Sequence, residues 1–458
     1  MDGLAFLTAI EQADLVRRGE VTSAELVETY LERIERLDPD LNAYVTVCAD
    51  EARAAASGSL PDGPFRGVPL PIKDLSETAG VRTTFSSRAF ADYVPMFDAA
   101  VVRRLKDAGF VVLGKTNTPE LGLTAVTESE LNGPCRNPWD PSRTSGGSSG
   151  GAAAAVAAGL APAAQGSDGG GSIRIPASCC GLFGIKPARG RVSPAPYGGL
   201  EGFSTSGPIA RTVLDAASLL DVMAGYETGD PYWAPPPERP FAEEVGADPG
   251  RLRVALTTTP PIDAPVDPMC AAAARDAASL LEELGHSVDE ATPEWHGDQL
   301  FGGFMKVWQV MPALQPLPRE LFEPETQALM DAASQLGAVD YVRATAGLRD
   351  VSRRIVAFFE SYDLLLTPTL AQPPVPIGAL DDDDPWVQFA NAGRFTPFTQ
   401  VANITGLPAV SLPLSWSDEG LPIGAQLVGR PAGEATLIRV SAQLEQAHPW
   451  RDRRPPVS

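Results

Sequence analysis

The sequence predicts an α/β fold: a large, mixed, largely buried β-sheet flanked by helices. Three observations carry this prediction. The chain has 458 residues with 44% hydrophobic content, which is ample for a packed core. Short apolar segments of strand length alternate with longer segments of helical periodicity. This alternation continues from the first third of the chain to its end, which is typical of helices packed around one sheet.

Each element is predicted from its hydrophobic period and from the residues that begin it. The second helix opens with Thr22 or Ser23 as the capping residue and Glu25 as the acid of a capping box. Short apolar runs such as "GVPLPIKDL" and "GFVVLGKTN" predict strands. In chain order we expect helices at 4–18 and 22–37, strands at 43–47, 67–75 and 109–117, a helix at 151–159, a β-α step at 251–257 and 268–284, strands at 363–370, 408–414 and 422–429, and a closing helix at 434–447.

Charge and cysteine content exclude several classes of partner. The net charge of −22 repels phosphate backbones and anionic lipid surfaces, so we expect no nucleic acid and no membrane as partner. The N-terminal "MDGLAFLTAIEQADL" has no basic region typical of a signal peptide. Five scattered cysteines without a CxxC spacing favour a reducing cytoplasm, and three dispersed histidines predict no metal site. A small neutral molecule is the expected substrate.

Two glycine loops that contain serines, within residues 144–181, are the strongest candidate for a functional site. Ser148 and Ser149 lie in the first loop and Ser172 in the second, and glycine lets backbone N–H groups converge on a ligand. Neither loop has the lysine of a phosphate-binding P-loop, and "GGGSIRIP" is not a dinucleotide fingerprint. Residues 147–151, "GSSGG", do fit the GxSxG pattern around Ser149, so a Ser-His-Asp triad is one interpretation.

The base that would activate such a serine is not an obvious histidine. His286, His296 and His448 all lie outside the glycine-rich half, and each is expected to be structural or exposed. Lys73 is the leading alternative among five lysines because it lies in an apolar run, where burial lowers the pKa of a lysine. The competing interpretation is that Lys73 extends from a strand end to solvent or pairs with Asp74.

Five segments together resemble the amidase signature family. The likeness spans nearly the whole chain. Within the family, the pattern of this sequence most resembles bacterial hydrolases of aminohexanoate oligomers and aryl amides. The segments are "KDL" (73–75), "GKTNTPELG" (114–122), "GGSSGGAAAAVAAG" (146–159), "GSDGGGSIRIPASCCGLFGIKPARGRVS" (166–193) and "FTQVANITGLPAVSLP" (398–413).

The resemblance implies a Ser–cis-Ser–Lys triad, with Ser172 as nucleophile, Ser148 as the bridging cis-serine and Lys73 as base. Ser149 then becomes a supporting neighbour. The backbone N–H groups of the second loop would form the oxyanion hole, and an ion pair would brace that loop. The implied oxyanion residues are Gly169, Gly170, Gly171 and Ser172, and the implied ion pair joins Asp168 to Arg174.

The resemblance also implies one amidase signature domain over residues 1–458. Its catalytic core is expected at about 60–225 and a substrate-loop region at about 226–400. Within 295–345, the apolar residues Trp295, Phe301, Phe304, Met305 and Trp308 form either a hydrophobic lid over a substrate pocket or an ordinary packed helix.

The expected function is hydrolysis of small or oligomeric aryl or alkyl amides through an acyl-enzyme, without a cofactor. Carbamates present the same carbonyl, so urethanes are included among the expected substrates. Two alternatives stay open: an A-type subunit of a glutamine amidotransferase that works with a partner chain, and a protein that binds amides without cleaving them. Homodimer formation is also left open.

Overall fold

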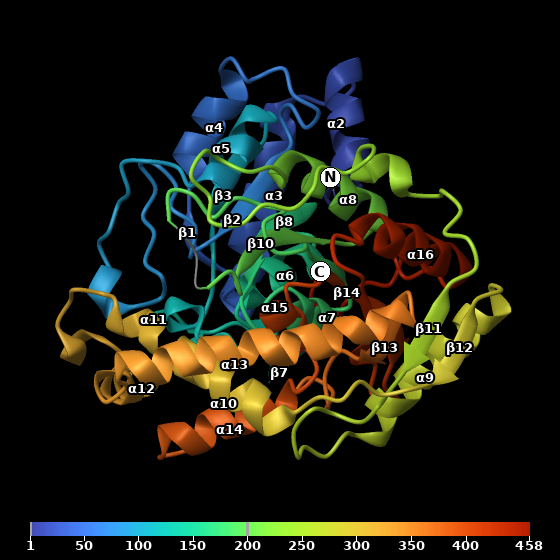
Figure 1. Cartoon of the computed structure of the whole chain (residues 1–458). Coiled ribbons are helices and arrows are strands. Elements are labelled where there is room, and N and C mark those ends of the chain that lie inside the picture. Colours follow the sequence, from blue (N-terminus) through green and yellow to red (C-terminus); the bar gives the residue numbers. More distant parts are fainter. Residues whose placement is uncertain (1, 198–200) are drawn as a thin grey trace.

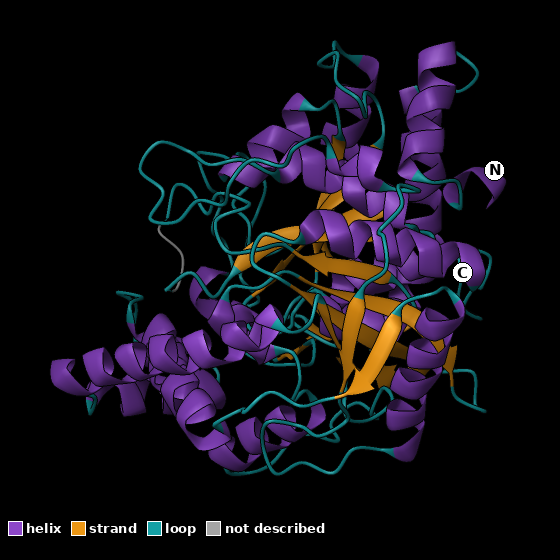
Figure 2. Cartoon of the chain, turned by 45° about the vertical axis from the view of Figure 1, so that its right-hand side comes forward, coloured by secondary structure: helices purple, strands orange, loops and turns teal. Residues whose placement is uncertain are grey.

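A computed structural model describes residues 2–197 and 201–458, and it confirms the predicted α/β class. Strands gather in the interior and helices surround them (Figures 1 and 2). The central sheet has eight strands and is mixed: β12, β11 and β13 run parallel, and the remaining neighbours are antiparallel. Its order is β12 (Ser287–Glu290), β11 (Arg253–Leu256), β13 (Leu364–Pro368), β15 (Pro422–Gly429), β14 (Ala409–Trp416), β9 (Phe183–Lys186), β10 (Thr205–Ala210) and β8 (Ala163–Asp168).

A second, three-stranded sheet lies beside the edge strand β8. The connection is direct, because the backbone N–H of Lys73 in β2 donates to Gln165 Oε1 in β8 at 3.0 Å. The strands of this sheet, in order, are β1 (Tyr44–Val47), β3 (Val111–Thr116) and β2 (Pro69–Lys73), and two short ribbons pair β4 (Glu128–Ser129) with β5 (Gly133–Pro134) and β6 (Arg136–Asn137) with β7 (Asp140–Thr144).

The helices cover both faces of the central sheet, and α13 crosses the front of the molecule in Figure 1. They are α1 (Asp2–Ala5), α2 (Ala9–Arg18), α3 (Ser23–Leu41), α4 (Ala49–Ser57), α5 (Ala100–Asp107), α6 (Gly150–Ala157), α7 (Arg174–Cys180), α8 (Val213–Met223), α9 (Pro268–Glu283), α10 (Gly297–Trp308), α11 (Val310–Ala313), α12 (Pro324–Ser334), α13 (Ala338–Ala357), α14 (Pro385–Phe395), α15 (Gln400–Thr405) and α16 (Glu434–Ala447).

Strand β13 shows why the sheet needs helices on both sides. Its side chains alternate between faces. Leu364 and Leu366 join the largest apolar cluster, with α8, α9 and α16, whereas Leu365 packs in a second cluster with α10 and α13. Burial of each leucine contributes roughly 1.5–3 kcal/mol. The continuous apolar run of β13 is therefore explained by burial on both faces.

The N-terminal helix predicted at 4–18 is divided in the structure, which is a correction. Helix α1 ends at Ala5 and α2 begins at Ala9, because Thr8 adopts an extended backbone and caps α2. The Thr8 hydroxyl accepts from the Glu11 N–H at 3.0 Å, and the Glu11 carboxylate accepts from the Thr8 N–H at 2.7 Å. The capping box predicted for α3 is present at Thr22 and Glu25.

The region at 226–400 contains more than loops. It supplies β11, β12 and β13 of the central sheet as well as α9 to α14.

In the described part of the chain, no helix has the length and apolar character needed to cross a membrane. All five cysteines are buried as free thiols.

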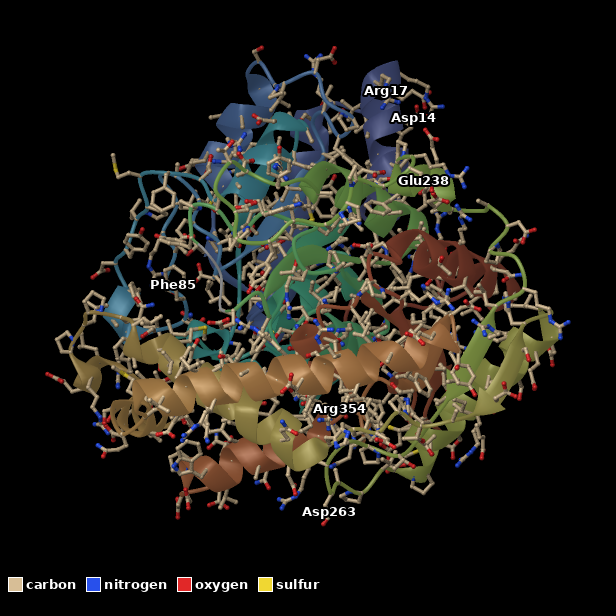
Figure 3. The ribbon with its side chains drawn as sticks, in the orientation of Figure 1. Asp14, Arg17, Phe85, Glu238, Asp263 and Arg354 are labelled. Carbon is tan, nitrogen blue, oxygen red and sulfur yellow. The ribbon has the colours of Figure 1, made fainter. Side chains whose placement is uncertain are left out.

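Charged side chains extend outward around the molecule, as Figure 3 shows for Asp14 and Arg17 of α2 and for Arg354 of α13. Arg17 and Asp14 form an ion pair at 3.0 Å, with side chains 63% and 45% exposed. Exposed pairs of this kind contribute about 1 kcal/mol or less. Stability rests on the interior, where a few buried charges need specific partners.

Candidate active site

Lys73 lies at the carboxyl end of β2, and its side chain is fully buried. Its Nζ lies 2.7 Å from Ser148 Oγ, 3.1 Å from Ser167 Oγ and 3.4 Å from the Ser167 carbonyl oxygen. Burial lowers the pKa of Lys73 to about 7, although the negative charge of Asp168 opposes the shift. Half of the Lys73 side chains are therefore neutral near pH 7.

Asp74 is not the partner that the competing interpretation gave to Lys73. Its carboxylate lies 3.8 Å from Lys115 Nζ and accepts hydrogen bonds from the N–H and the hydroxyl of Thr84, at 3.0 and 2.5 Å. Asp74 follows the last residue of β2 and begins a turn, and its hydrogen-bond partner there is Thr84. The polar partners of the Lys73 ammonium are serines.

The first glycine loop brings Ser148 to Lys73 and ties itself to the second loop. The Gly147–Ser148 peptide bond is cis. A Cβ on Gly147 would lie 2.6 Å from the Val126 carbonyl carbon, so a side chain there would displace the loop. The Ser149 N–H donates to the Ser172 carbonyl at 3.1 Å, and the Ser149 hydroxyl donates to the Ser167 carbonyl at 3.1 Å. Ser149 thus holds the two loops together.

The second loop presents unpaired backbone donors beside Ser172. Within residues 2–197 and 201–458, the N–H groups of Gly169, Gly170 and Ser172 have no hydrogen-bond acceptor. The Gly171 N–H instead donates to Asp168 Oδ1 at 2.8 Å. The Gly171 N–H therefore already has an acceptor and helps to brace the loop, whereas the other three N–H groups are unpaired; the oxyanion role of Gly171 stays a prediction.

Asp168 and Arg174 form the predicted ion pair, and both side chains are fully buried. Arg174 donates to both carboxylate oxygens of Asp168, at 2.9 and 3.0 Å, which is the bidentate geometry that guanidinium favours. Burial by itself raises the pKa of Asp168, but the charge and hydrogen bonds of Arg174 outweigh it and hold the pKa at about 2. The carboxylate also accepts from the Ile173 N–H at 3.1 Å, so it shapes the turn that carries Ser172.

Residues far along the chain complete this brace, and the sequence analysis assigned them no role. Arg174 donates to Gln426 Oε1 at 2.7 Å and to Asn403 Oδ1 at 2.6 Å, and the Asn403 amide donates to Asp168 at 2.8 Å. A signal was present: both are amides within apolar segments, "FTQVANITG" and "PIGAQLVG". Buried polar groups need partners, so such residues mark a hidden polar contact.

Two cavities, of about 380 and 320 Å³, meet at Ser172. Ser172 is buried, with 7% of the residue exposed, and it lines both of them. The larger one has an aromatic wall from α10 and α14, where Phe304 and Trp308 stack with ring centroids 5.1 Å apart. The smaller one contains Ser148 and the carboxylate residue Glu77. Helix α10 is therefore a packed helix whose apolar residues also line this cavity, and a role as a lid stays a prediction.

The histidines are not among the residues that line the cavities at Ser172. His286 lies 2.9 Å from Gln443 Oε1 through its Nε2, and its Nδ1 accepts from the Leu252 N–H at 3.1 Å. Among the described residues, no group of His, Cys, Asp and Glu could hold a metal ion. The GxSxG interpretation of Ser149 thus lacks a histidine base in this geometry.

Comparison with known proteins gives consistent relatives. A family model described as Amidase matches residues 25–438. The chain is 39% identical to the 6-aminohexanoate-cyclic-dimer hydrolase of Paenarthrobacter ureafaciens, over 98% of this chain and 96% of that protein. It is 36% identical to an acylamidase of Rhodococcus erythropolis, over 99% and 98%. A solved structure of 6-aminohexanoate cyclic dimer hydrolase superposes with a TM-score of 0.95, at 39% identity and 99% coverage of both chains.

Proposed function

We propose that this chain, which belongs to the amidase family, is an amide hydrolase in which Ser172 is the nucleophile, Ser148 the proton relay and Lys73 the base. One observation carries the proposal. A fully buried lysine with a pKa of about 7 lies 2.7 Å from Ser148, and Ser148 shares a cavity with Ser172.

Acylation would begin with attack of Ser172 Oγ on the amide carbonyl carbon. As the new C–O bond forms, the Ser172 proton passes to Ser148 Oγ, and the Ser148 proton passes to neutral Lys73 Nζ. The carbonyl oxygen becomes an oxyanion. The N–H groups of Gly169, Gly170 and Ser172 are the donors available to it, and loss of one such donor typically costs about 10²–10³-fold in rate.

Collapse of the tetrahedral intermediate would break the C–N bond and form the acyl-enzyme. The relay now runs backwards: Lys73 returns its proton through Ser148 to the leaving nitrogen, which departs as a neutral amine. Water then attacks the acyl-enzyme with the same relay as base, and the carboxylic acid leaves. A lysine whose pKa is about 7 both accepts and returns a proton readily at neutral pH.

The cavities support an aryl or alkyl amide as substrate. We assign the aromatic cavity beside Trp308 to an apolar group and the smaller, more polar cavity to the other side of the scissile bond. The likeness to hydrolases named for aminohexanoate and acyl amides supports the same class. Carbamates share the reacting carbonyl, and we include them in the proposed range. Cytoplasmic location stays a prediction, and homodimer formation stays open.

Labelling and substitution test the nucleophile. Treatment with phenylmethanesulfonyl fluoride is expected to sulfonylate Ser172, as peptide mass spectrometry would show. Ser172→Ala should abolish hydrolysis of an anilide while the unfolding midpoint stays close to wild type. Sulfonylation of Ser149 would instead revive the GxSxG interpretation. Full retention of turnover by Ser172→Ala would refute the proposed mechanism, and wild-type protein that binds amides without cleaving them would support the non-catalytic alternative.

A further inference from the structure

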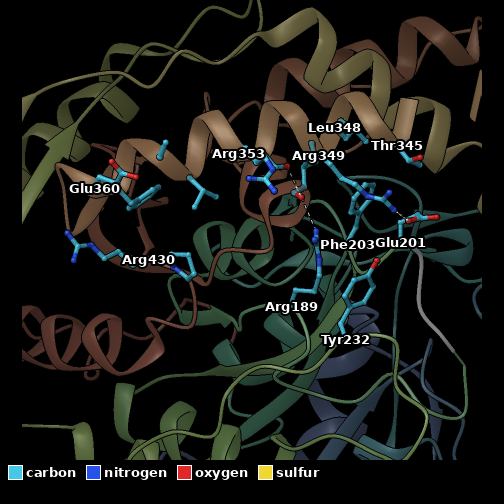
Figure 4. Close-up of a pocket in the computed structure, with 16 residues that line it drawn as sticks. Arg189, Glu201, Phe203, Tyr232, Thr345, Leu348, Arg349, Arg353, Glu360 and Arg430 are labelled. Carbon is cyan, nitrogen blue, oxygen red and sulfur yellow. Dashed lines mark hydrogen bonds and ion pairs between the residues drawn. The ribbon is translucent and has the colours of Figure 1, made fainter. Parts of the chain in front are cut away.

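A third cavity lies apart from Ser172, between α13 and the core. Its volume is about 1030 Å³, and it shares no lining residue with the two cavities at Ser172. Figure 4 shows its wall of arginines drawn from three parts of the chain: Arg349 and Arg353 from α13, Arg189 from the segment after β9, and Arg430 from the turn after β15. The proposed hydrolysis uses none of these residues.

Of the four arginines that line the cavity, Arg430 already has a partner, because its guanidinium pairs with Asp363 at 2.9 Å. The two arginines of α13 are less well paired. Arg349 and Arg353 are four residues apart and lie on one face of α13, where like charges repel each other. Their partners inside the protein are weak. Arg349 lies 3.7 Å from Glu201, and within the described ranges Arg353 has no hydrogen-bond or ion-pair partner. A bound anion would relieve this repulsion.

Arg189 adds an inward-facing cation. Its guanidinium donates to the carbonyl oxygens of Gly202, Asn403 and Ile404 at 2.8 to 3.0 Å, and it lies over the ring of Tyr232 at 5.4 Å. These contacts use Nε and Nη2, so Nη1 keeps its donors for a ligand. Burial lowers the pKa of Arg189, but a guanidinium stays charged at neutral pH.

The remainder of the wall decides what kind of anion fits. Phe203, Leu348 and Phe359 line the cavity but belong to the packed core. Val356 and Ala357 also line it and stay partly exposed, so they offer apolar surface to a ligand with an apolar body. Glu201 and Glu360 also line it. These carboxylates would repel a polyanion such as a nucleoside triphosphate, so a single negative charge suits the site better.

We propose that this cavity binds an organic monocarboxylate whose body is an aryl or alkyl chain. Guanidinium groups pair with carboxylates through two parallel hydrogen bonds, and Arg349 and Arg353 are placed to supply them. The apolar body would lie against Val356 and Ala357, which stay partly exposed in the cavity. The proposal rests on the cavity alone and does not require that Ser172 be catalytic, although acids of this class are also products of amide hydrolysis.

Binding of 4-phenylbutyrate, measured by isothermal calorimetry on full-length Ser172→Ala protein, tests the proposal. We expect a dissociation constant below about 1 mM that weakens as salt rises, because the contact is ionic. The double variant Arg349→Gln/Arg353→Gln should weaken binding at least tenfold, about 1.4 kcal/mol. Arg343→Gln is the matched control, since Arg343 is on the same helix, 78% exposed and outside the cavity, and it should leave affinity unchanged.

Two further ligands define the chemistry. Neutral 4-phenylbutanol should bind at least tenfold more weakly than the carboxylate, and inorganic phosphate should also bind more weakly, because it lacks an apolar body. Equal binding of phosphate would overturn the assignment of an organic ligand, and equal binding of the alcohol would overturn the anionic one. Unchanged phenylbutyrate affinity in the double variant would place the ligand elsewhere and refute the site.

Discussion

Replacement of Lys73 tests the central step of the proposed mechanism, because the free lysine must be neutral to accept a proton. A lysine of ordinary pKa 10.5 would be neutral in about one molecule in 3,000 at pH 7, whereas one with a pKa of about 7 is neutral in about half. Burial therefore increases the active fraction about a thousandfold. We expect the acylation rate to rise about tenfold per pH unit below pH 7 and to level off above pH 8, with an apparent pKa that belongs to the coupled Lys-Ser-Ser unit.

The assay is single-turnover acylation with an anilide and with an activated ester, followed from pH 5 to pH 9. Lys73→Ala should lose roughly 10²–10⁴-fold with the anilide and should also lose the pH dependence. The ester should lose less, because its leaving group needs no proton. Lys73→Arg should be nearly as slow as Lys73→Ala with the anilide, because guanidinium stays protonated.

Lys186 provides a matched control, because it is also buried with a pKa lowered to about 7, mainly by desolvation. Its Nζ donates to the Pro187 carbonyl at 2.7 Å, away from the serines. Lys186→Met should keep the rise of acylation rate with pH. If Lys73→Ala kept near-normal anilide turnover with the wild-type pH dependence, or if Lys186→Met lost that dependence, Lys73 would not be the base.

Three further outcomes are expected. Asp168→Asn should lower the free energy of unfolding by about 3–5 kcal/mol in urea titrations, because it leaves Arg174 buried without its counter-charge. Asp14→Asn removes one partner of an exposed pair and should lower it by less than about 1 kcal/mol. Equal losses in the two variants would contradict a bracing role for Asp168. The folded pKa of Lys73 is lowered, so between about pH 7 and 10.5 the folded chain has lost a proton that the unfolded chain keeps. The unfolding free energy of wild type relative to Lys73→Met should therefore rise by up to about 5 kcal/mol across that window, and a flat difference would mean that the pKa is not lowered. Dialysis against EDTA should leave hydrolysis unchanged, and loss with recovery on adding a divalent ion would contradict the metal-free mechanism.

Local periodicity was enough to predict most elements. The predicted closing helix at 434–447 and the strand at 422–429 coincide with α16 and β15, because their apolar residues repeat at helical and strand spacing within one short window. The division of the first helix at Thr8 was missed for the same reason. The apolar pattern continues through Thr8, but Thr8 adopts an extended backbone and forms a capping box, so one helix ends before it and a new one begins after it.

The same distinction between local sequence pattern and long-range contact applies to the residues of the candidate site. An isolated lysine in "VPLPIKDL" and serines in glycine loops are properties of short segments, so both can be recognised as candidates without any knowledge of the fold. Hydrogen-bond partners are set by contacts between distant segments. Lys73 meets Ser148 across 75 positions, Arg174 meets Gln426 across 252, and only the tertiary structure directs the Gly171 N–H to Asp168. The arginine-lined cavity likewise exists because α13, the segment after β9 and the turn after β15 pack together, and no local pattern encodes that packing.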